Sequence, residues 1–335
     1  MNEFFPQIVF TSPGKAELLQ VSKSELPADP QSTLIETEYS IISPGTELAC
    51  LSGKESWAPL PFRPGYGSVG RVIQAGKRED LAVGQRVFTF GAHGAYGAAQ
   101  VICLPLSEGT DPAQAVFARM AAVSITALRV SDVALGDTVA VFGLGPVGNL
   151  AAQLFALSGC RVIGIDLSEK RREVAQQCGI PHVLASGADI REQVTALTGG
   201  RLCRTVVEAT GLSAVAEQAI ALAGKQGEMI LLGSPRAAHN ANLTSFLNHI
   251  HLWGDGCVTV KGAHEWRFPI GDGEHVRHSI ERNVQIILGL IAEKKLQVAP
   301  LLTHRLSPAD CQTAYDGLLK EKDRYLGVIF DWSKA

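Results

Sequence analysis

Residues 138–148 read Thr-Val-Ala-Val-Phe-Gly-Leu-Gly-Pro-Val-Gly, and this stretch decides the fold class. The apolar run Thr138–Phe142 is typical of a buried strand. It leads directly into the glycine pattern of residues 143–148, and an apolar helical stretch follows from Leu150 to Leu157. A strand, a glycine-rich turn and a helix in this order predict the first turn of a dinucleotide-binding βαβ unit.

Each glycine of this pattern has a separate physical task. Gly143 allows the tight turn, Gly145 lets the backbone approach a pyrophosphate, and Gly148 lets the helix pack closely on the strand. Pro146 and Val147 open the helix, whose unpaired N–H groups and positive dipole end then face the phosphates. We therefore predict that these five residues bind the cofactor.

A carboxylate follows the next strand. Residues Arg161–Ile165 form an apolar run that ends at Asp166, 23 residues after Gly143. A carboxylate at this place accepts hydrogen bonds from the adenosine ribose and repels a 2′-phosphate, so Asp166 favours NAD over NADP. Arg171 lies close by in the sequence, and its positive charge would offset part of this preference.

The alternation of strands and helices continues to about Lys261, with further strands expected at Val183–Leu184, Thr205–Glu208, Met229–Leu232 and Cys257–Val260. Such alternation predicts a doubly wound parallel sheet of the Rossmann type. Ligands of these sheets lie at the carboxyl ends of the strands. Further cofactor contacts are therefore predicted at Ala209, Thr210, Leu232, Gly233, Ser234 and Ala263.

The two ends of the chain differ from its middle in composition and in predicted secondary structure. The first ~120 residues are rich in glycine and proline and contain short β-like runs, which is typical of a barrel-like β domain. After Lys261 the sequence predicts helices at Ser279–Glu293 and Pro308–Leu319 and a last strand at Leu326–Phe330. We predict an α/β protein with a β-barrel catalytic domain of residues 1–122, completed by residues 265–335. Residues 123–264 then form the Rossmann dinucleotide-binding domain.

Composition limits the partners and the compartment. The net charge of −3 gives no global field that would attract nucleic acid or an anionic membrane. The chain has no apolar run of about 18 residues and no secretory signal at its start. Its seven cysteines are scattered without a CxxC pair, which is typical of reduced, buried thiols. These features predict a soluble cytoplasmic protein that acts on small molecules.

Four segments together resemble the medium-chain dehydrogenase/reductase superfamily. They read SPGTE at 43–47, RPGYGSVGRV at 63–72, LGDTVAVFGLGPVG at 135–148 and PLLTHRLSPAD at 300–310. The resemblance covers nearly the whole chain. It implies a GroES-like catalytic domain, a Rossmann domain and an NAD-dependent dehydrogenase that acts on CH–OH groups.

The positions at which this superfamily holds its catalytic zinc carry other residues here. The resemblance aligns them with Pro44, with Gly65-Tyr66-Gly67 and with Arg119. Proline, glycine and arginine do not ligate zinc, and tyrosine is an uncommon ligand. The family's four-cysteine lobe is also replaced, by the short run Gly91–Gly97. The resemblance therefore implies a zinc-independent member with no metal site.

Without zinc, a side chain must manage the proton of the alcohol. The resemblance places Tyr66 in the former metal cavity and Thr46 at the hydroxyl of the family's proton relay. His264 follows a segment that passes the nicotinamide in the family. Glu47 replaces a supporting acid, for which structural and catalytic roles are equally open. The predicted catalytic residues are, in this order, Tyr66, Thr46, His264 and Glu47.

Three further residues are predicted to contact the substrate. His93 lies in the shortened loop, Arg119 can hold an anionic group, and Trp266 offers a flat face to a sugar ring. The zinc-free subgroup resembles sugar, glycoside and cyclitol dehydrogenases, so the expected reaction is hydride transfer from a secondary hydroxyl of such a compound to NAD.

Two alternatives stay open. One is a zinc-free quinone or enoyl reductase of the same superfamily, and the other is a non-catalytic protein that senses NAD. The strand Gly256–Val260 commonly pairs across a dimer in the family, so a homo-oligomer, dimer or tetramer, is expected.

Overall fold

The computed structural model describes residues 3–335. Contacts between residues divide the chain into two compact units. The first unit contains the residues up to Arg119, Val284–Lys294 and Leu301–Ala335, and the second contains Met120–Asn283 and Lys295–Pro300. Residues 265–283 and 295–300 thus lie in the second unit, whereas we predicted from the sequence that they complete the first domain.

The second unit is built on a six-stranded sheet in which every neighbouring pair of strands is parallel. The strand order is β10-β9-β8-β11-β12-β13, so the winding reverses between β8 and β11. This confirms the predicted doubly wound fold, in which ligands bind where the order reverses. The strands are β8 (Thr138–Phe142), β9 (Arg161–Asp166), β10 (His182–Ala185), β11 (Cys203–Glu208), β12 (Ala223–Leu231) and β13 (Thr259–Gly262).

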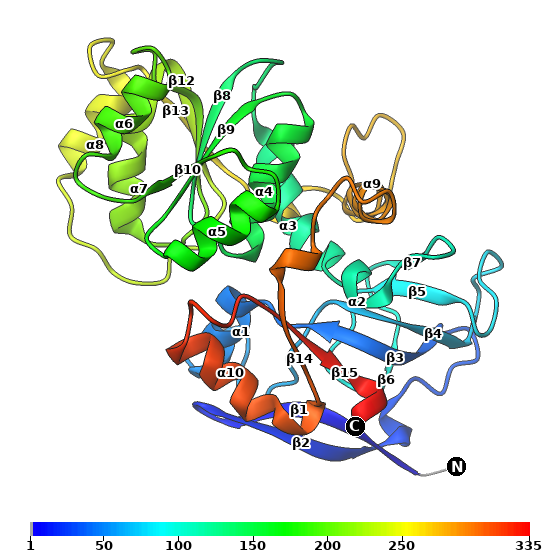
Figure 1. Cartoon of the computed structure of the whole chain (residues 1–335). Helices are drawn as coiled ribbons and strands as arrows, with labels where there is room; N and C mark the ends of the chain where they lie inside the picture. Colours follow the sequence, from blue (N-terminus) through cyan, green and yellow to red (C-terminus); the bar gives the residue numbers. More distant parts are fainter. Residues whose placement is uncertain (1–2) are drawn as a thin grey trace. The chain divides into compact units, whose positions relative to one another are not determined.

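Helices cover both faces of this sheet (Figure 1). Along β8, Val139 and Val141 pack in one core with residues of α3, α4 and α5, whereas Ala140 and Phe142 pack in another with residues of α6 and α7. A strand buried on both faces needs apolar residues pointing both ways, as residues 139–142 provide. The helices are α3 (Ala118–Val130), α4 (Pro146–Leu157), α5 (Glu169–Gln177), α6 (Ile190–Leu197), α7 (Ser213–Ala219) and α8 (Leu243–His251).

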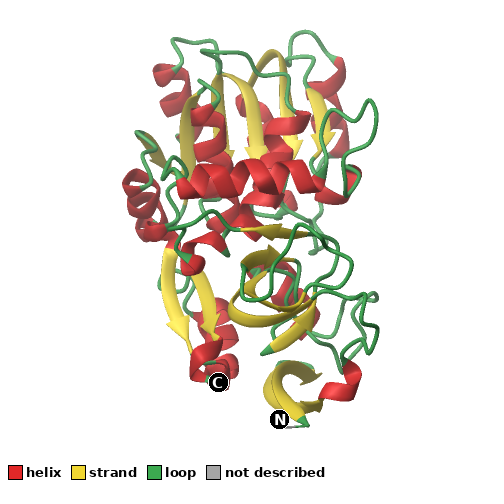
Figure 2. Ribbon diagram, turned by 90° about the vertical axis from the view of Figure 1, so that its right-hand side faces the viewer, coloured by secondary structure: helices red, strands yellow, loops and turns green. Residues whose placement is uncertain are grey.

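The first unit contains a seven-stranded mixed sheet and a separate hairpin. The hairpin, β1 with β2, is the curled pair of strands beside the N label in Figure 2. The sheet follows the order β14-β15-β3-β4-β5-β7, and β6 pairs with β3. The strands are β1 (Phe4–Ser12), β2 (Lys15–Ser22), β3 (Leu34–Ile41), β4 (Ser68–Gln74), β5 (Arg86–Thr89), β6 (Tyr96–Ala98), β7 (Cys103–Pro105), β14 (Leu302–Leu306) and β15 (Gly327–Asp331).

The end of the chain completes the core of the first unit. Strand β15 pairs antiparallel with β3, and α10 contributes Tyr315, whose ring meets that of Phe10 at 4.9 Å in an edge-on contact. The remaining helices are α1 (Pro44–Leu51), α2 (Pro112–Ala115), α9 (Ile280–Ala292) and α10 (Cys311–Lys320). Within residues 3–335, no helix combines the length and the apolar character that crossing a bilayer requires.

Several elements differ from the sequence-based expectation. The hairpin of β1 and β2, strand β14 and helix α8 were not predicted. The last strand of the parallel sheet begins at Thr259, because Cys257 has a φ of +52° and cannot continue an extended strand. Helix α10 begins at Cys311, because residues 308–310 form a separate 3₁₀ turn.

Candidate functional site

We call residues 143–148 the glycine turn. At two of its positions, a side chain would collide with neighbouring atoms. Gly143 has a φ of +87°, and a Cβ there would lie 2.7 Å from Cγ2 of Thr210. A Cβ on Gly148 would lie 1.8 Å from the carbonyl oxygen of Gly143. Both contacts are too short for any side chain, so the close approach of helix and strand depends on these glycines.

Gly145 differs from the other two because its free side is open. A Cβ there would meet Nη1 of Arg171 at 4.0 Å and no nearer atom. Gly145 is also the N-cap of α4, and no side chain caps this helix. The first N–H groups of α4 therefore remain available to an anion. The residues present fit the diphosphate of a dinucleotide.

Asp166 joins the end of β9 to the glycine turn. Its Oδ2 accepts the N–H of Leu144 at 2.7 Å, and its Oδ1 accepts the N–H of Ser168 at 2.8 Å. Each carboxylate oxygen keeps a second lone pair, so Asp166 can still accept ribose hydroxyls. Arg171 places Nη1 3.9 Å from Oδ2 of Asp166, whereas Arg172 donates to the carbonyl oxygens of Asp166 and Leu167.

The other predicted cofactor residues gather at the carboxyl ends of β11, β12 and β13. Thr210 contacts the glycine turn beside Gly143. No role was predicted for Glu208, yet its carboxylate accepts hydrogen bonds from this same loop. The only signal for it in the sequence is an acidic residue at the end of an apolar strand. The predicted residues at these strand ends are Ala209, Thr210, Leu232, Gly233, Ser234 and Ala263.

Three predicted residues, Thr46, Tyr66 and Arg119, meet in the first unit with Ser43 and Phe90, and we call these five residues the Tyr66 cluster. The hydroxyl of Tyr66 donates to Oγ of Ser43, the residue before α1. The guanidinium of Arg119 lies 4.4 Å from the centre of the Tyr66 ring and 4.2 Å from that of Phe90. Arg119 is thus held between two aromatic faces, which is a favourable setting for a cation.

Burial raises the pKa of the Tyr66 phenol. The charge of Arg119 and hydrogen bonds with Ser43 and Thr46 act in the opposite direction but do not outweigh burial. Tyr66 therefore keeps its proton at neutral pH, so it can donate a hydrogen bond and is a weak base.

Two glycines beside Tyr66 make room for side chains from elsewhere in the unit. A Cβ on Gly67 would lie 2.5 Å from Cβ of Arg119. A Cβ on Gly65, whose φ is +96°, would lie 2.6 Å from the backbone nitrogen of His93. The sequence Gly-Tyr-Gly is thus complementary to Arg119 and His93.

Glu47 and His93 form a buried network. Glu47 accepts hydrogen bonds from the backbone N–H of Ser43 at 2.8 Å and the hydroxyl of Tyr315 at 2.6 Å, and it pairs with Nε2 of His93 at 2.9 Å. Nδ1 of His93 lies 2.8 Å from Oγ of Ser40. His93 is 0% exposed and both of its ring nitrogens have partners, so it supports the core and does not present a nitrogen to a substrate. Glu47 likewise holds the start of α1.

His264 and Trp266 lie in the second unit, on the short turn after β13. His264 is exposed at the N-cap of the 3₁₀ turn Glu265–Arg267, and Trp266 is half exposed. Neither contributes to a buried core there.

The side chains of the first unit do not fit a catalytic zinc. Among residues 3–335, no three or more His, Cys, Asp and Glu side chains are grouped so that they could hold a metal ion. At the aligned positions stand Pro44 at the start of α1, Tyr66 bound to Ser43, and Arg119 stacked on two rings.

A family model described as zinc-binding dehydrogenase matches residues 146–267, which contain most of the parallel sheet and α4. Over this segment the chain is similar to the zinc-binding dehydrogenases. It is a dehydrogenase of the class that acts on CH–OH groups, as the predicted motifs indicated.

Two curated relatives extend the match over most of the chain. The L-galactonate-5-dehydrogenase of Escherichia coli (strain K12) is 24% identical over 298 residues, which cover 74% of this chain and 88% of that enzyme. The 2-desacetyl-2-hydroxyethyl bacteriochlorophyllide A dehydrogenase of Rhodobacter capsulatus is 27% identical over 326 residues, which cover 91% and 92%. The solved structure of L-idonate 5-dehydrogenase from Escherichia coli superposes with a TM-score of 0.82 at 15% identity, over 98% of both chains.

Proposed function

We propose that this dehydrogenase oxidises a secondary hydroxyl of a sugar, glycoside or cyclitol, transfers the hydride to NAD, and does so without a catalytic zinc. The observation that carries the proposal is the glycine turn, whose open side at Gly145 lies beside the carboxylate of Asp166. This arrangement suits a diphosphate with an adjacent ribose.

The second unit supplies the groups that would hold the cofactor. The N–H groups at the start of α4 would bind the diphosphate, and Asp166 would accept the ribose hydroxyls. Asp166 would favour NAD over NADP, and the positive charge of Arg171, 3.9 Å away, would offset part of this preference. Bound nicotinamide supplies the hydride acceptor. The loops after β11, β12 and β13 would contact the rest of the dinucleotide.

The first unit supplies the groups that would handle the proton. Tyr66 would hydrogen-bond the reacting oxygen of the substrate, with Thr46 beside it and the charge of Arg119 over its ring. Because the phenol is protonated at neutral pH, it acts as a donor in carbonyl reduction. Alcohol oxidation, which needs a proton acceptor, should become faster as the pH rises toward the pKa of Tyr66. Glu47 and His93 hold this cluster in place.

The substrate class rests on the polar cluster and on the relatives. Tyrosine, threonine and arginine side chains suit a ligand with several hydroxyl groups, because unpaired polar groups penalise an apolar ligand. The L-galactonate-5-dehydrogenase of Escherichia coli is, by its name, a dehydrogenase of L-galactonate. We also propose His264 as a catalytic residue and Trp266 as a face for a sugar ring.

We further propose a cytoplasmic homo-oligomer. Strand β13 is an edge strand of its sheet, and a second copy could pair with it.

The test is a spectrophotometric screen of sugars, glycosides, sugar acids and inositols with NAD and with NADP, in the presence and absence of a strong chelator. We expect reduction of NAD with at least one compound and no effect of the chelator. Loss of activity with the chelator, and its return with added zinc, would contradict the metal-free reaction. Cofactor binding without turnover of any compound would instead favour a protein that senses NAD.

A further inference from the structure

Glu208 is a buried acid at the place where the winding of the parallel sheet reverses. It is the last residue of β11, the neighbour of β8 in the sheet, and only 2% of it is exposed. Burying a carboxylate is costly unless hydrogen bonds compensate. The partners of Glu208 therefore indicate what the residue is for.

Both the side chain and the backbone of Glu208 hold loops at the cofactor edge. The carboxylate accepts the N–H of Thr210 at 2.6 Å and that of Gly211 at 3.1 Å, and it also accepts the hydroxyl of Thr210. The backbone carbonyl of Glu208 accepts the N–H groups of Leu232 and Gly233, each at 2.8 Å. One residue thus fixes the loop after β11 and the loop after β12.

These loops touch each other and the glycine turn. A Cβ on Gly233 would lie 2.2 Å from the backbone nitrogen of Gly211, so the two loops are in backbone contact. On the other side, Cγ2 of Thr210 occupies the space beside Gly143. A displacement of Thr210 would therefore reach the turn on which the diphosphate is proposed to bind.

We propose that Glu208 is a positioning residue for the cofactor site: its carboxylate fixes Thr210 and Gly211 so that both loops and the glycine turn present one continuous binding surface to the dinucleotide. This inference rests on the proposed function, because it assumes that NAD binds at the glycine turn.

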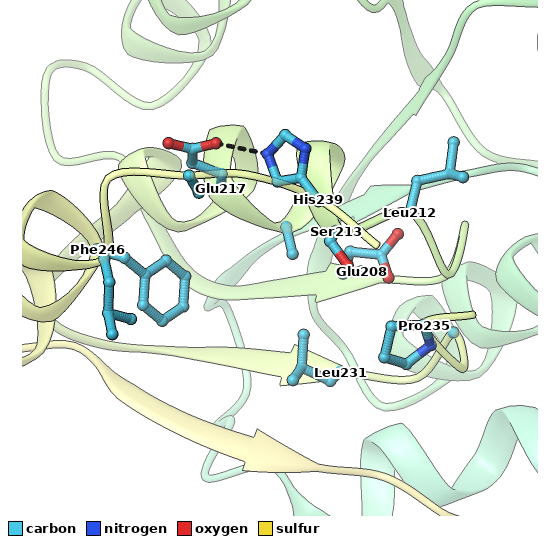
Figure 3. A pocket seen from close by; sticks show the side chains of 12 residues that line it. Glu208, Leu212, Ser213, Glu217, Leu231, Pro235, His239 and Phe246 are labelled. Atoms are coloured by element: carbon cyan, nitrogen blue, oxygen red, sulfur yellow. Dashed lines mark hydrogen bonds and ion pairs between the residues drawn. The ribbon is translucent and has the colours of Figure 1, made fainter. Parts of the chain in front are cut away.

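The buried Glu208 side chain borders a pocket on one side. The residue lines a pocket of about 330 Å³ together with Leu212, Ser213 and Pro235 (Figure 3). His239 and Glu217, joined at 2.9 Å, also line this pocket. The adjacent space means that a neutral side chain of equal size can be accommodated at position 208 without a clash.

The experiment compares Glu208→Gln with Glu228→Gln as a matched control. Glu228 lies on β12 and is 1% exposed. It accepts hydrogen bonds from the Thr205 hydroxyl, the N–H of Asp132 and the ammonium of Lys261, none of which belongs to the loops after β11 and β12. Both variants remove one buried negative charge. We expect the dissociation constant of NAD, measured by calorimetry, to rise about tenfold in Glu208→Gln, which corresponds to one hydrogen bond to a charged group. In Glu228→Gln it should change less than about twofold.

A second readout needs no cofactor. Hydrogen exchange measured by mass spectrometry should become faster at residues 209–212 and 232–234 in Glu208→Gln and not in the control. Glu208→Asp, which keeps the charge but withdraws it from Gly211, should also weaken NAD binding. Normal NAD affinity in both position-208 variants, or equal weakening in the control, would overturn the inference. If the wild-type protein does not bind NAD, the proposed function fails, while the exchange experiment still tests the role of Glu208 in holding the loops.

Discussion

The glycine turn of the second unit and the Tyr66 cluster of the first unit are built in opposite ways. The turn consists of six consecutive residues, and its ligand groups are backbone N–H groups at the start of α4. The cluster brings together side chains from positions 43 to 119 and contacts the Glu47 network, which reaches Tyr315. A site made of backbone depends on local geometry, whereas a site made of side chains depends on the packing of the whole unit.

The difference also determines how each site can be damaged. The turn tolerates no added atom at Gly143 or Gly148, but it needs no particular side chain to bind a phosphate. The cluster depends on the identity of each member, because each side chain is held by partners that are distant in sequence.

The largest effect is expected for Gly148→Val. A Cβ at this position would lie 1.8 Å from a backbone oxygen, which cannot move without opening the turn. We expect the loss of at least about 3 kcal/mol of folding free energy and of measurable NAD binding. Thermal melting and calorimetry with NAD measure both.

Gly289→Ala is the matched control for that variant. Gly289 lies within α9, and a Cβ there meets no atom within 4 Å. It should stabilise the protein by about 0.5–1 kcal/mol and leave NAD binding unchanged. A Gly148→Val protein that binds NAD normally would show that the turn is not the cofactor site.

The next largest effect is expected for Glu47→Gln. The amide keeps the shape of the side chain but loses the negative charge and one of the two acceptor oxygens. His93 and Tyr315 both contact the same oxygen of Glu47, Oε2. Because hydrogen bonds to charged groups are worth about 1.5–3 kcal/mol, a loss of about 2 kcal/mol is expected in urea unfolding. Tyr315→Phe, which removes one partner, should cost less. NAD affinity should stay unchanged in both, and a large drop would show that the two sites are not independent.

The glycine turn was easier to predict from the sequence than the Tyr66 cluster. The turn was predictable because its glycine pattern is local and Asp166 follows at a regular distance, although the contact of Gly143 with Thr210 is not contained in that pattern. Three members of the Tyr66 cluster, Thr46, Tyr66 and Arg119, were predicted from the aligned positions, but Ser43, Phe90 and the arrangement of the cluster were not. His93 was expected at the substrate, whereas the structure buries it between Glu47 and Ser40.

The residues that were missed share one physical property. Glu208, Ser43 and Tyr315 act through contacts that no spacing rule contains, because their partners are fixed by tertiary packing. The hairpin of β1 and β2 was missed for a similar reason: its strands mix buried and exposed positions irregularly, without a clear alternation.

A double-mutant cycle at Gly67 and Arg119 tests whether the cluster is complementary in shape. Gly67→Ala introduces a methyl group 2.5 Å from Cβ of Arg119, and we expect it to cost about 1–2 kcal/mol. In an Arg119→Gly background most of this cost should disappear, because the atoms in contact are gone. A coupling energy of about 1 kcal/mol from urea unfolding supports the complementarity, and additive effects would contradict it.

The smallest effect concerns the alkaline stability of the first unit. Burial holds the pKa of Tyr66 above its usual value of 10, so above pH 10 the unfolded chain loses this proton while the folded chain keeps it. The unfolded state then binds fewer protons, and stability falls with rising pH by up to about 1.4 kcal/mol per pH unit until the folded pKa is passed. Tyr66→Phe should lose less stability than the wild type between pH 10 and 11, as judged from melting temperatures. The backbone groups of the glycine turn do not titrate in this range, so the ratio of NAD affinities of the two proteins should stay constant. If the two proteins lose stability in parallel, Tyr66 is not buried as a neutral phenol, and the contrast between a titrating cluster and a turn that does not titrate would be lost.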